Sequence, residues 1–188
     1  MKRRTALWLP AVLLPGRTAA ADDDAALSAA LRAGGVAVVL RHALTEAGVG
    51  DPPGFRAGDC ATQRNLSAEG RDQAQRIGAW FRDRELRPVR VRSSAWCRCL
   101  DTATLAFGRA EPWAVLNSSF GEGAPNAARE AAIDAALARI GAHAFEVWVT
   151  HQVNIAAMIG ASVAIGEGCV LRRAAAARQL VGRSRFGA

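Results

Sequence analysis

Short apolar runs that alternate with helical patterns constrain the fold of this chain more than any other feature of its sequence. Residues 35–40 read G-V-A-V-V-L, a continuous apolar run with the length of a buried strand. Strands that are apolar on both faces are typical of parallel sheets covered by helices on both sides. Further strand and helix patterns alternate after this run. We therefore expect an α/β fold with three layers, in which a mostly parallel sheet lies between two layers of helices.

The pattern predicts one domain, because 188 residues are close to the usual size of a single domain and no internal boundary is visible. Helices are predicted at residues 27–34, 74–81, 97–107, 133–140 and 154–160, and Ser67 is a suitable cap for the second of them. Strands are predicted at residues 35–40, 89–92, 113–116 and 145–150, with short edge strands at 169–172 and 179–182. Two long polar loops, 45–65 and 117–126, remain, and long loops are often functional.

The first residues have the pattern of a secretory signal peptide. Three cations, Lys2, Arg3 and Arg4, precede a short apolar run at 5–14, and three alanines at 19–21 fit a cleavage site. The apolar run is about half the length of a membrane-spanning helix, so we expect no stable membrane insertion. We predict a signal peptide at 1–21, a mature domain at 22–188, and export, most simply to the periplasm. The pattern leaves open whether the route is general secretion or twin-arginine export.

The positive charge of the chain is concentrated at this leader. The formal net charge is +7, and Lys2, Arg3, Arg4 and Arg17 supply four of the seven charges. What remains is too weak to indicate the basic stripe of a nucleic-acid-binding protein. We therefore expect no nucleic-acid partner. The oligomeric state is left open.

Export would place four cysteines in an oxidising compartment, where disulfides form. Three complete pairings are possible, and a bridge from Cys60 to either Cys97 or Cys99 is plausible because Cys60 lies in a loop and the other two lie near a helix start. A bridge between Cys97 and Cys99 is disfavoured because its ring is too tight for a helix. The spacing of Cys97, Cys99 and Cys169 is not that of a zinc site, so no metal and no cofactor are expected.

The residues with reactive side chains come directly after predicted strands. Arg41 and His42 follow the first strand, Arg98 lies one turn into the helix after the second, and His151 follows the fourth. In open α/β sheets the carboxyl ends of the strands form the ligand site, so these four side chains should converge. Guanidinium groups bind phosphate oxygens in pairs, and a neutral imidazole can attack phosphorus. The arrangement predicts phosphoryl transfer on a small phosphorylated substrate.

The same residues lie in blocks that resemble the histidine phosphatase superfamily, whose members share the phosphoglycerate mutase-like fold. Residues 40–43 (L-R-H-A) are similar to its R-H-G signature, and 64–74 (R-N-L-S-A-E-G-R-D-Q-A) to its second block. Residues 91–103 and 149–154 resemble the third block and the block of the second histidine, and the pattern from Gly166 fits the tail. The order of the blocks is correct over nearly the whole predicted mature domain. In detail the chain resembles a small-domain group of exported bacterial members.

This resemblance implies a role for each matching residue. His42 would be the nucleophile that becomes phosphorylated, and Arg41, Arg98 and His151 would bind the phosphoryl group. Arg64 would reach the substrate from the loop side. The family also uses a carboxyl group that protonates the leaving oxygen. Position favours Glu122 for that role, Glu46 is the alternative, and some small members have no such acid.

The resulting hypothesis is an exported, metal-independent phosphomonoesterase that acts through a phosphohistidine. Three alternatives remain: a phosphate- or phosphosugar-binding protein on the same fold that performs no catalysis, a phosphomutase, and a redox or metal protein that uses its cysteines. The phosphomutase is disfavoured because it needs a closed pocket with further cationic contacts. The sequence does not identify the physiological substrate.

Overall fold

The computed structural model describes the backbone of residues 19–121, 126–175 and 177–187, with side chains from residue 24 onward. Along the chain the helices and strands occupy these residues: α1 (Ala19–Ala33), β1 (Val36–Arg41), η1 (Cys60–Thr62), α2 (Ala68–Arg82), β2 (Arg90–Ser93), α3 (Cys97–Phe107), β3 (Glu111–Pro112), η2 (Ala114–Leu116), α4 (Ala127–Ala138), β4 (Phe145–Thr150), α5 (Gln152–Ile159), β5 (Gly168–Ala174) and β6 (Ala177–Ser184). The elements η1 and η2 are short 3₁₀ helices.

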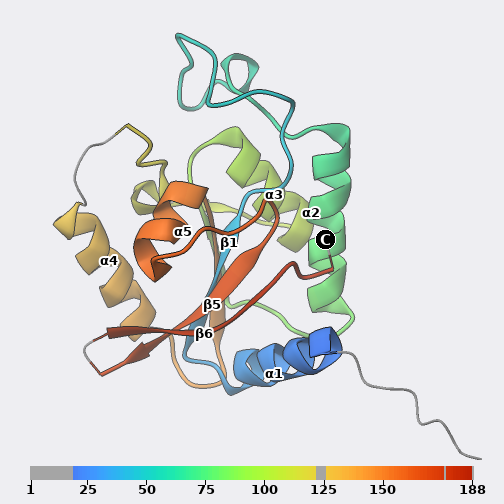
Figure 1. Cartoon of the computed structure of the whole chain (residues 1–188), viewed down its shortest axis with the longest axis vertical. Helices are drawn as coiled ribbons and strands as arrows, with labels where there is room; N and C mark the ends of the chain where they lie inside the picture. The colour runs from blue at the N-terminus through green and yellow to red at the C-terminus, as the bar shows by residue number, and fades with distance from the viewer. Residues whose placement is uncertain (1–18, 122–125, 176, 188) are drawn as a thin grey trace, which may run out of the picture.

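One sheet with the strand order β3-β2-β4-β1-β5-β6 forms the middle of the molecule. The first four strands in this order pair in parallel, whereas β5 pairs antiparallel with β1 and β6 pairs antiparallel with β5. Helices α2 and α3 lie on one side of the sheet, and α4 and α5 lie on the other (Figure 1). The three-layer α/β prediction is therefore confirmed.

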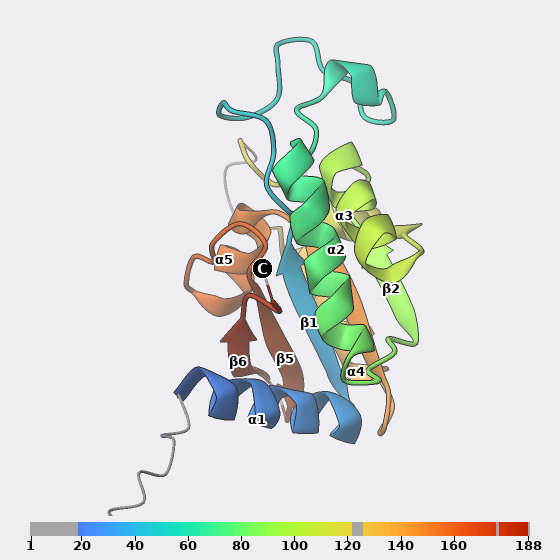
Figure 2. The same cartoon turned by 90° about the vertical axis from the view of Figure 1, so that its right-hand side faces the viewer.

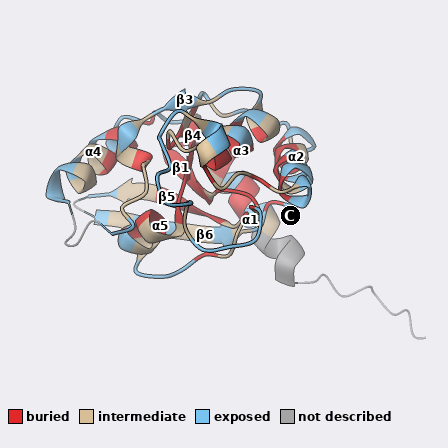
Figure 3. Ribbon diagram, turned by 90° about the horizontal axis from the view of Figure 1, so that it is seen from above, coloured by how far each residue is buried: buried red, intermediate tan, exposed pale blue. Residues whose placement is uncertain are grey.

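The burial pattern of β1 explains the layers. Val36, Val38 and Leu40 pack against α1, α2 and α3, and the alternate residues Ala37 and Val39 pack against α4 and α5. Successive side chains of a strand point to opposite faces, so a continuous apolar run serves two cores at once. Buried residues accordingly concentrate in the sheet and on the inner faces of the helices (Figure 3).

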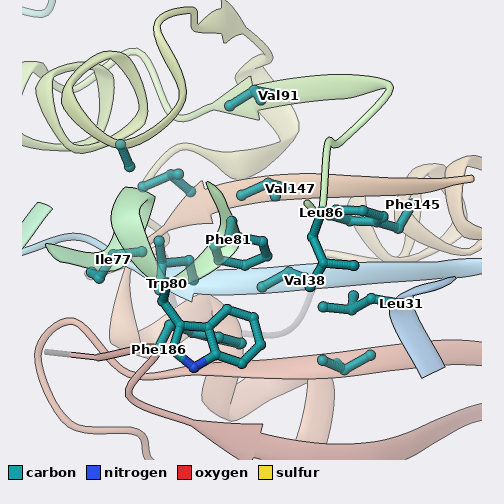
Figure 4. Close-up of a cluster of buried hydrophobic side chains, with 14 of the residues drawn as sticks. Leu31, Val38, Ile77, Trp80, Phe81, Leu86, Val91, Phe145, Val147 and Phe186 are labelled. Atoms are coloured by element: carbon teal, nitrogen blue, oxygen red, sulfur yellow. The ribbon is translucent and has the colours of Figure 1, made fainter. Parts of the chain in front are cut away.

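Aromatic rings fill the core on the α2 side. The ring of Phe81 packs against Phe145, Phe107 and Phe186, and Trp80 meets both Phe81 and Phe186 with ring centroids 5.0 Å apart (Figure 4). Edge-to-face and offset rings at such distances add to the stability gained by burial. This core holds α2 and α3 rigidly beneath the loops that they carry.

The two predicted edge strands are longer in the structure than the sequence predicts, and one of them does not lie at an edge of the sheet. The predicted strands at 169–172 and 179–182 form a hairpin of seven and eight residues, β5 and β6. Only β6 is an edge, because β5 lies inside the sheet next to β1. The extension comes from arginine-rich segments, whose alkyl stems can cover apolar surface while their charges stay in water.

The predicted strand at 113–116 is wrong. The strand β3 is confined to Glu111–Pro112, and the chain then turns through η2. The turn buries Leu116 and directs its carbonyl group to the hydroxyl of Thr150 (2.7 Å) and the amide of Asn154 (3.0 Å). These hydrogen bonds satisfy a buried carbonyl that lies outside the sheet, which the apolar pattern could not indicate.

Helix α1 crosses beneath the lower end of the sheet (Figure 2). The carboxylate of Asp24 accepts hydrogen bonds from Trp80 Nε1 at 2.9 Å and from Ser184 Oγ at 3.2 Å, so α1 is joined to α2 and to the last strand. Residues 1–18 of the predicted signal peptide lie outside the described residues, and residues 19–21 begin α1. Over the described residues, no helix combines the length and the apolarity that a membrane crossing requires.

Candidate active site

A cavity of about 510 Å³ lies at the carboxyl ends of the parallel strands and is lined in part by the loop 45–65. Figure 2 shows this loop above the end of β1. Its lining includes Arg41, His42, Arg64, Arg98 and His151, all of which are site residues predicted from the sequence. The cavity has the volume of a small-molecule site. A second cavity of about 540 Å³, between α2 and α3, contains none of these residues.

His42 follows β1 and is held by hydrogen bonds on its backbone and on its ring. Its backbone amide donates to Thr150 O at 3.1 Å, and its ring Nδ1 lies 2.9 Å from Ala43 O. A carbonyl oxygen only accepts, so Nδ1 carries the proton and Nε2 carries the free lone pair. Burial, aided by the charges of Arg98 and Arg41 and opposed by the Ala43 hydrogen bond, lowers the pKa of His42 to about 3. The ring is therefore neutral at physiological pH.

His151 lies beside His42, with the two ring centroids 5.6 Å apart. Its Nε2 lies 2.8 Å from Ser94 Oγ, and the buried thiol of Cys99 lies 3.6 Å from the same nitrogen. Burial, aided by the neighbouring His42 and Arg98, lowers the pKa of His151 to about 2. When Ser94 is the donor in this contact, the neutral ring accepts at Nε2 and has its proton on Nδ1.

Three arginines concentrate positive charge in the cavity. Arg41 donates from Nη1 to Val163 O at 2.9 Å, and Arg64 donates to Gly48 O. The Nε groups of Arg41, Arg64 and Arg98 are buried and have no hydrogen-bond partner among the described residues. Burial lowers the pKa of both Arg41 and Arg64, and each also has a neighbouring arginine that lowers it. Buried N–H groups without partners, on three guanidinium groups, suit an anion with several oxygens.

Asp51 is the site residue that the sequence did not reveal. Its carboxylate binds Arg98 through two hydrogen bonds of 2.6 and 3.1 Å, and it accepts from Trp96 Nε1 and from the amide of Arg64. Burial alone would raise the pKa of Asp51, but the hydrogen bonds from Arg98 and Arg64 outweigh it and lower the pKa. Asp51 is therefore ionised, and it is already paired with a predicted phosphate-binding arginine.

Of the two carboxyl groups predicted as proton donors, the structure describes one and not the other. Glu46 is exposed and is not among the residues that line the cavity. Glu122 lies outside the described residues, although Phe120, two positions earlier, lines the cavity. Among the described residues, Asp51 is the carboxylate that lines the cavity, and its pairing with Arg98 keeps it from donating a proton.

The second sequence block positions the chain around His42. Ser67 caps α2 by accepting from the amide of Gly70, and Gln73 Oε1 accepts from the amide of Leu44 at 2.9 Å. A side chain at Gly70 would collide with the carbonyl of Leu44, since its Cβ would lie 1.8 Å from that oxygen. In the third block, Thr102 Oγ1 accepts from the amide of Ala43 at 3.0 Å. These residues therefore hold the loop that presents His42.

A disulfide joins Cys60 to Cys97 and so connects the loop 45–65 to the start of α3. This is one of the two bridges that the sequence left open. Cys99 and Cys169 are free and buried, and burial raises the pKa of each thiol to about 12. Within the described part of the chain, no cluster of His, Cys, Asp and Glu residues could hold a metal ion. The Cys60–Cys97 bridge thus fixes one point of a loop that lines the cavity.

Comparisons with known proteins concern the family and the fold of the chain. The family model described as histidine phosphatase superfamily (branch 1) matches residues 37–124. Among curated proteins, no sequence matches the chain. The solved structure of the protein histidine phosphatase SixA complexed with tungstate is similar, with a TM-score of 0.56, 13% identity, and coverage of 79% of this chain and 95% of that one.

Two further solved structures have the same fold. A mycobacterial glucosyl-3-phosphoglycerate phosphatase gives a TM-score of 0.55 at 17% identity, over 77% of this chain and 96% of that one. A mutant phosphoserine phosphatase from Entamoeba histolytica, in complex with phosphoserine, gives a TM-score of 0.54 at 11% identity, over 80% of this chain and 97% of that one. At these identities the likeness concerns the fold, which matches the phosphoglycerate mutase-like fold predicted from the sequence blocks.

Proposed function

We propose that this chain, whose residues 37–124 match the histidine phosphatase superfamily, is a metal-independent phosphomonoesterase that works through a phosphohistidine on His42. The family match supports phosphatase activity in general, and the individual roles are our proposal. The observation that carries it is the state of His42, whose ring is neutral and hydrogen-bonded at Nδ1 to Ala43 O. This leaves the lone pair of Nε2 available in a cavity that contains Arg41, Arg98 and His151.

In the first step, Nε2 of His42 attacks phosphorus and forms an N–P bond while the P–O bond to the leaving group breaks. The electron pair of that bond leaves with the oxygen. Arg41 and Arg98 bind the phosphoryl oxygens, and His151 donates from Nδ1. Fixed donors of this kind stabilise charge that spreads over the transferring group, which is the main contribution that proteins make to phosphoryl transfer.

In the second step, water attacks the phosphohistidine, the N–P bond breaks, and inorganic phosphate leaves neutral His42 behind. Glu122 is our candidate for the acid that protonates the leaving oxygen and for the base that later activates water. Replacing it by Gln should then slow hydrolysis of alkyl phosphates more than that of p-nitrophenyl phosphate, whose leaving group needs no proton. Equal losses on the two substrates would assign the role to another residue.

The direct test measures hydrolysis of p-nitrophenyl phosphate with and without EDTA. We expect hydrolysis that is insensitive to the chelator, that is lost in His42→Ala, and that leaves an acid-labile phosphoryl group on the trapped enzyme. His143→Ala is the matched control because His143 is exposed and does not line the cavity. Full activity in His42→Ala would overturn the nucleophile. Thermal protection by phosphate without any hydrolysis would instead indicate a binding protein.

We also propose that the chain is exported and cleaved after Ala21, on the basis of its leader pattern. The protein recovered from the periplasm should begin at Asp22, as measured by N-terminal sequencing. Replacing Lys2, Arg3 and Arg4 by neutral residues should retain it in the cytoplasm. Recovery of the uncleaved chain in the cytoplasm of cells with normal export would contradict the proposal.

A further inference from the structure

We propose that the cavity selects aryl phosphates, which are phosphomonoesters of aromatic alcohols, through a rim of apolar side chains. The rim consists of the exposed Val49, Phe55 and Phe120 and the half-buried Trp96, all of which line the cavity. The inference rests on the proposed function and adds to it the class of the leaving group. It depends on where the exposed apolar residues lie and on how the rings are arranged.

Exposed apolar side chains are unevenly distributed over the described surface. Five large hydrophobic residues are exposed in the described part of the chain, and three of them, Val49, Phe55 and Phe120, lie on the rim. Val49 is 96% exposed and Phe120 is 75% exposed, so neither contributes to the core. Single exposed apolar residues are ordinary, but a group of them around a cavity marks a binding surface. The rim therefore indicates an apolar ligand group.

The rings form a continuous row from the nucleophile to the rim. The centroids of His42 and His151 are 5.6 Å apart, those of His151 and Trp96 are 5.6 Å apart, and those of Trp96 and Phe55 are 5.7 Å apart. All three separations lie in the range in which aromatic rings attract each other. A ring attached to phosphorus through one oxygen would lie in the same cavity as Trp96 and Phe55.

The distribution of polar groups argues against a polyhydroxylated leaving group. The charged side chains belong to the arginines and to Asp51, which is paired with Arg98. Ser118 and Gln152 are the uncharged polar residues besides the histidines that line the cavity. A sugar would need a partner for most of its hydroxyl groups, since an unpaired hydroxyl is costly to bury. An aromatic ring has no hydroxyl groups to pair, and it can pack against the four apolar side chains of the rim.

The chemistry of the leaving group is consistent with this selection. When the P–O bond breaks, an aryl oxide leaves with the electron pair and later takes a proton from water. A phenolic hydroxyl has a pKa of about 10, whereas water has a pKa near 15.7. An alkoxide is about as basic as hydroxide, so the less basic aryl oxide leaves more readily. Such a substrate can be cleaved whether or not Glu122 supplies a proton.

The experiment compares three substrates across four variants of the full mature chain. The substrates are phenyl phosphate, hexyl phosphate and glycerol phosphate. The rim variants are Phe55→Ala and Phe120→Ala, and the controls are Val89→Ala and Leu180→Ala, which remove exposed apolar side chains that do not line the cavity. Inhibition by inorganic phosphate is measured for each variant, because it reports whether the arginines and histidines are intact.

We expect each rim variant to lose about 2- to 12-fold in kcat/KM for phenyl phosphate, which is the range of one aromatic contact. Glycerol phosphate and inhibition by phosphate should change less than the phenyl substrate does, and the controls should behave like the wild type. Equal losses on all three substrates would overturn the proposal, as would equal losses on phenyl and hexyl phosphate, which would indicate a generic apolar rim. Absence of hydrolysis of every substrate by the wild type would reject the proposed function itself.

Discussion

Acid should destabilise this fold through His42 and His151, since both are neutral in the folded protein and gain a proton on unfolding. Burial lowers the pKa of His42 to about 3 and that of His151 to about 2, from an ordinary value of 6.5. Between these values the unfolded chain binds two protons that the folded chain does not bind. The stability that depends on neutral rings is therefore fully present above pH 6.5 and is lost as the pH falls toward 3.

The size of the effect follows from the displaced pKa values. At pH 5 an unfolded histidine with a pKa of 6.5 is about 97% protonated, while the folded rings are almost entirely neutral, which costs about 2 kcal/mol for each histidine relative to pH 8. The two histidines together account for about 4 kcal/mol. This is a large fraction of a typical unfolding free energy of about 5–15 kcal/mol.

Urea unfolding at pH 8 and at pH 5 measures this loss. In His42→Gln and in His151→Gln, the decrease in unfolding free energy between the two pH values should be smaller by about 2 kcal/mol than in the wild type. Comparing variants cancels the contribution of carboxyl groups, which is common to all of them. His143→Gln is the control, because His143 is exposed. If His42→Gln and His151→Gln lose as much stability between pH 8 and pH 5 as the wild type does, the fold does not hold the two rings neutral. The argument that His42 is a neutral nucleophile would then fail as well.

Three further outcomes are expected. Asp51→Asn frees Arg98 from its ion pair, so it should lower the unfolding free energy by about 1.5–3 kcal/mol but increase the thermal shift produced by phosphate, and an unchanged phosphate shift would contradict competition for Arg98. Removing the disulfide by Cys60→Ser should cost about 2–4 kcal/mol in chemical unfolding, and a variant as stable as the wild type would show that the bridge does not hold the loop. EDTA should leave the hydrolysis of p-nitrophenyl phosphate unchanged, and activity that is lost with EDTA and restored by a divalent cation would contradict a site without metal.

The residues that could be predicted from sequence are those fixed by strand ends. Arg41 is the last residue of β1, and His42 and His151 directly follow β1 and β4, so the topology of a parallel sheet brings them to one edge. Arg98 lies in the first turn of α3, and that helix starts from the same edge of the sheet. The apolar pattern predicts where the strands end, and the residues at those ends form the site. The sheet and the two helical layers were predicted for the same reason.

The residues that escaped prediction lie where no periodicity applies. Asp51 and Phe55 belong to a polar loop rich in Gly and Pro, whose conformation is set by distant hydrogen bonds such as those of Asp51 to Arg98 and Trp96. Ser94 directly follows β2, and its hydroxyl lies 2.8 Å from Nε2 of His151. A sequence pattern describes neighbours along the chain, and these contacts join residues 45 or more positions apart.

The bridge between Cys60 and Cys97 has a practical consequence for anyone who prepares this protein. Cytosol keeps thiols reduced, so material made there would carry the loop 45–65 attached only through noncovalent contacts. Partial oxidation after purification would then mix chains with the bridge and chains without it, and kinetic constants would vary with the oxidation history of the batch. Titrating free thiols in denatured samples before each assay would tell the two populations apart. The oxidised molecule has two free thiols, at Cys99 and Cys169, whereas the reduced molecule has four.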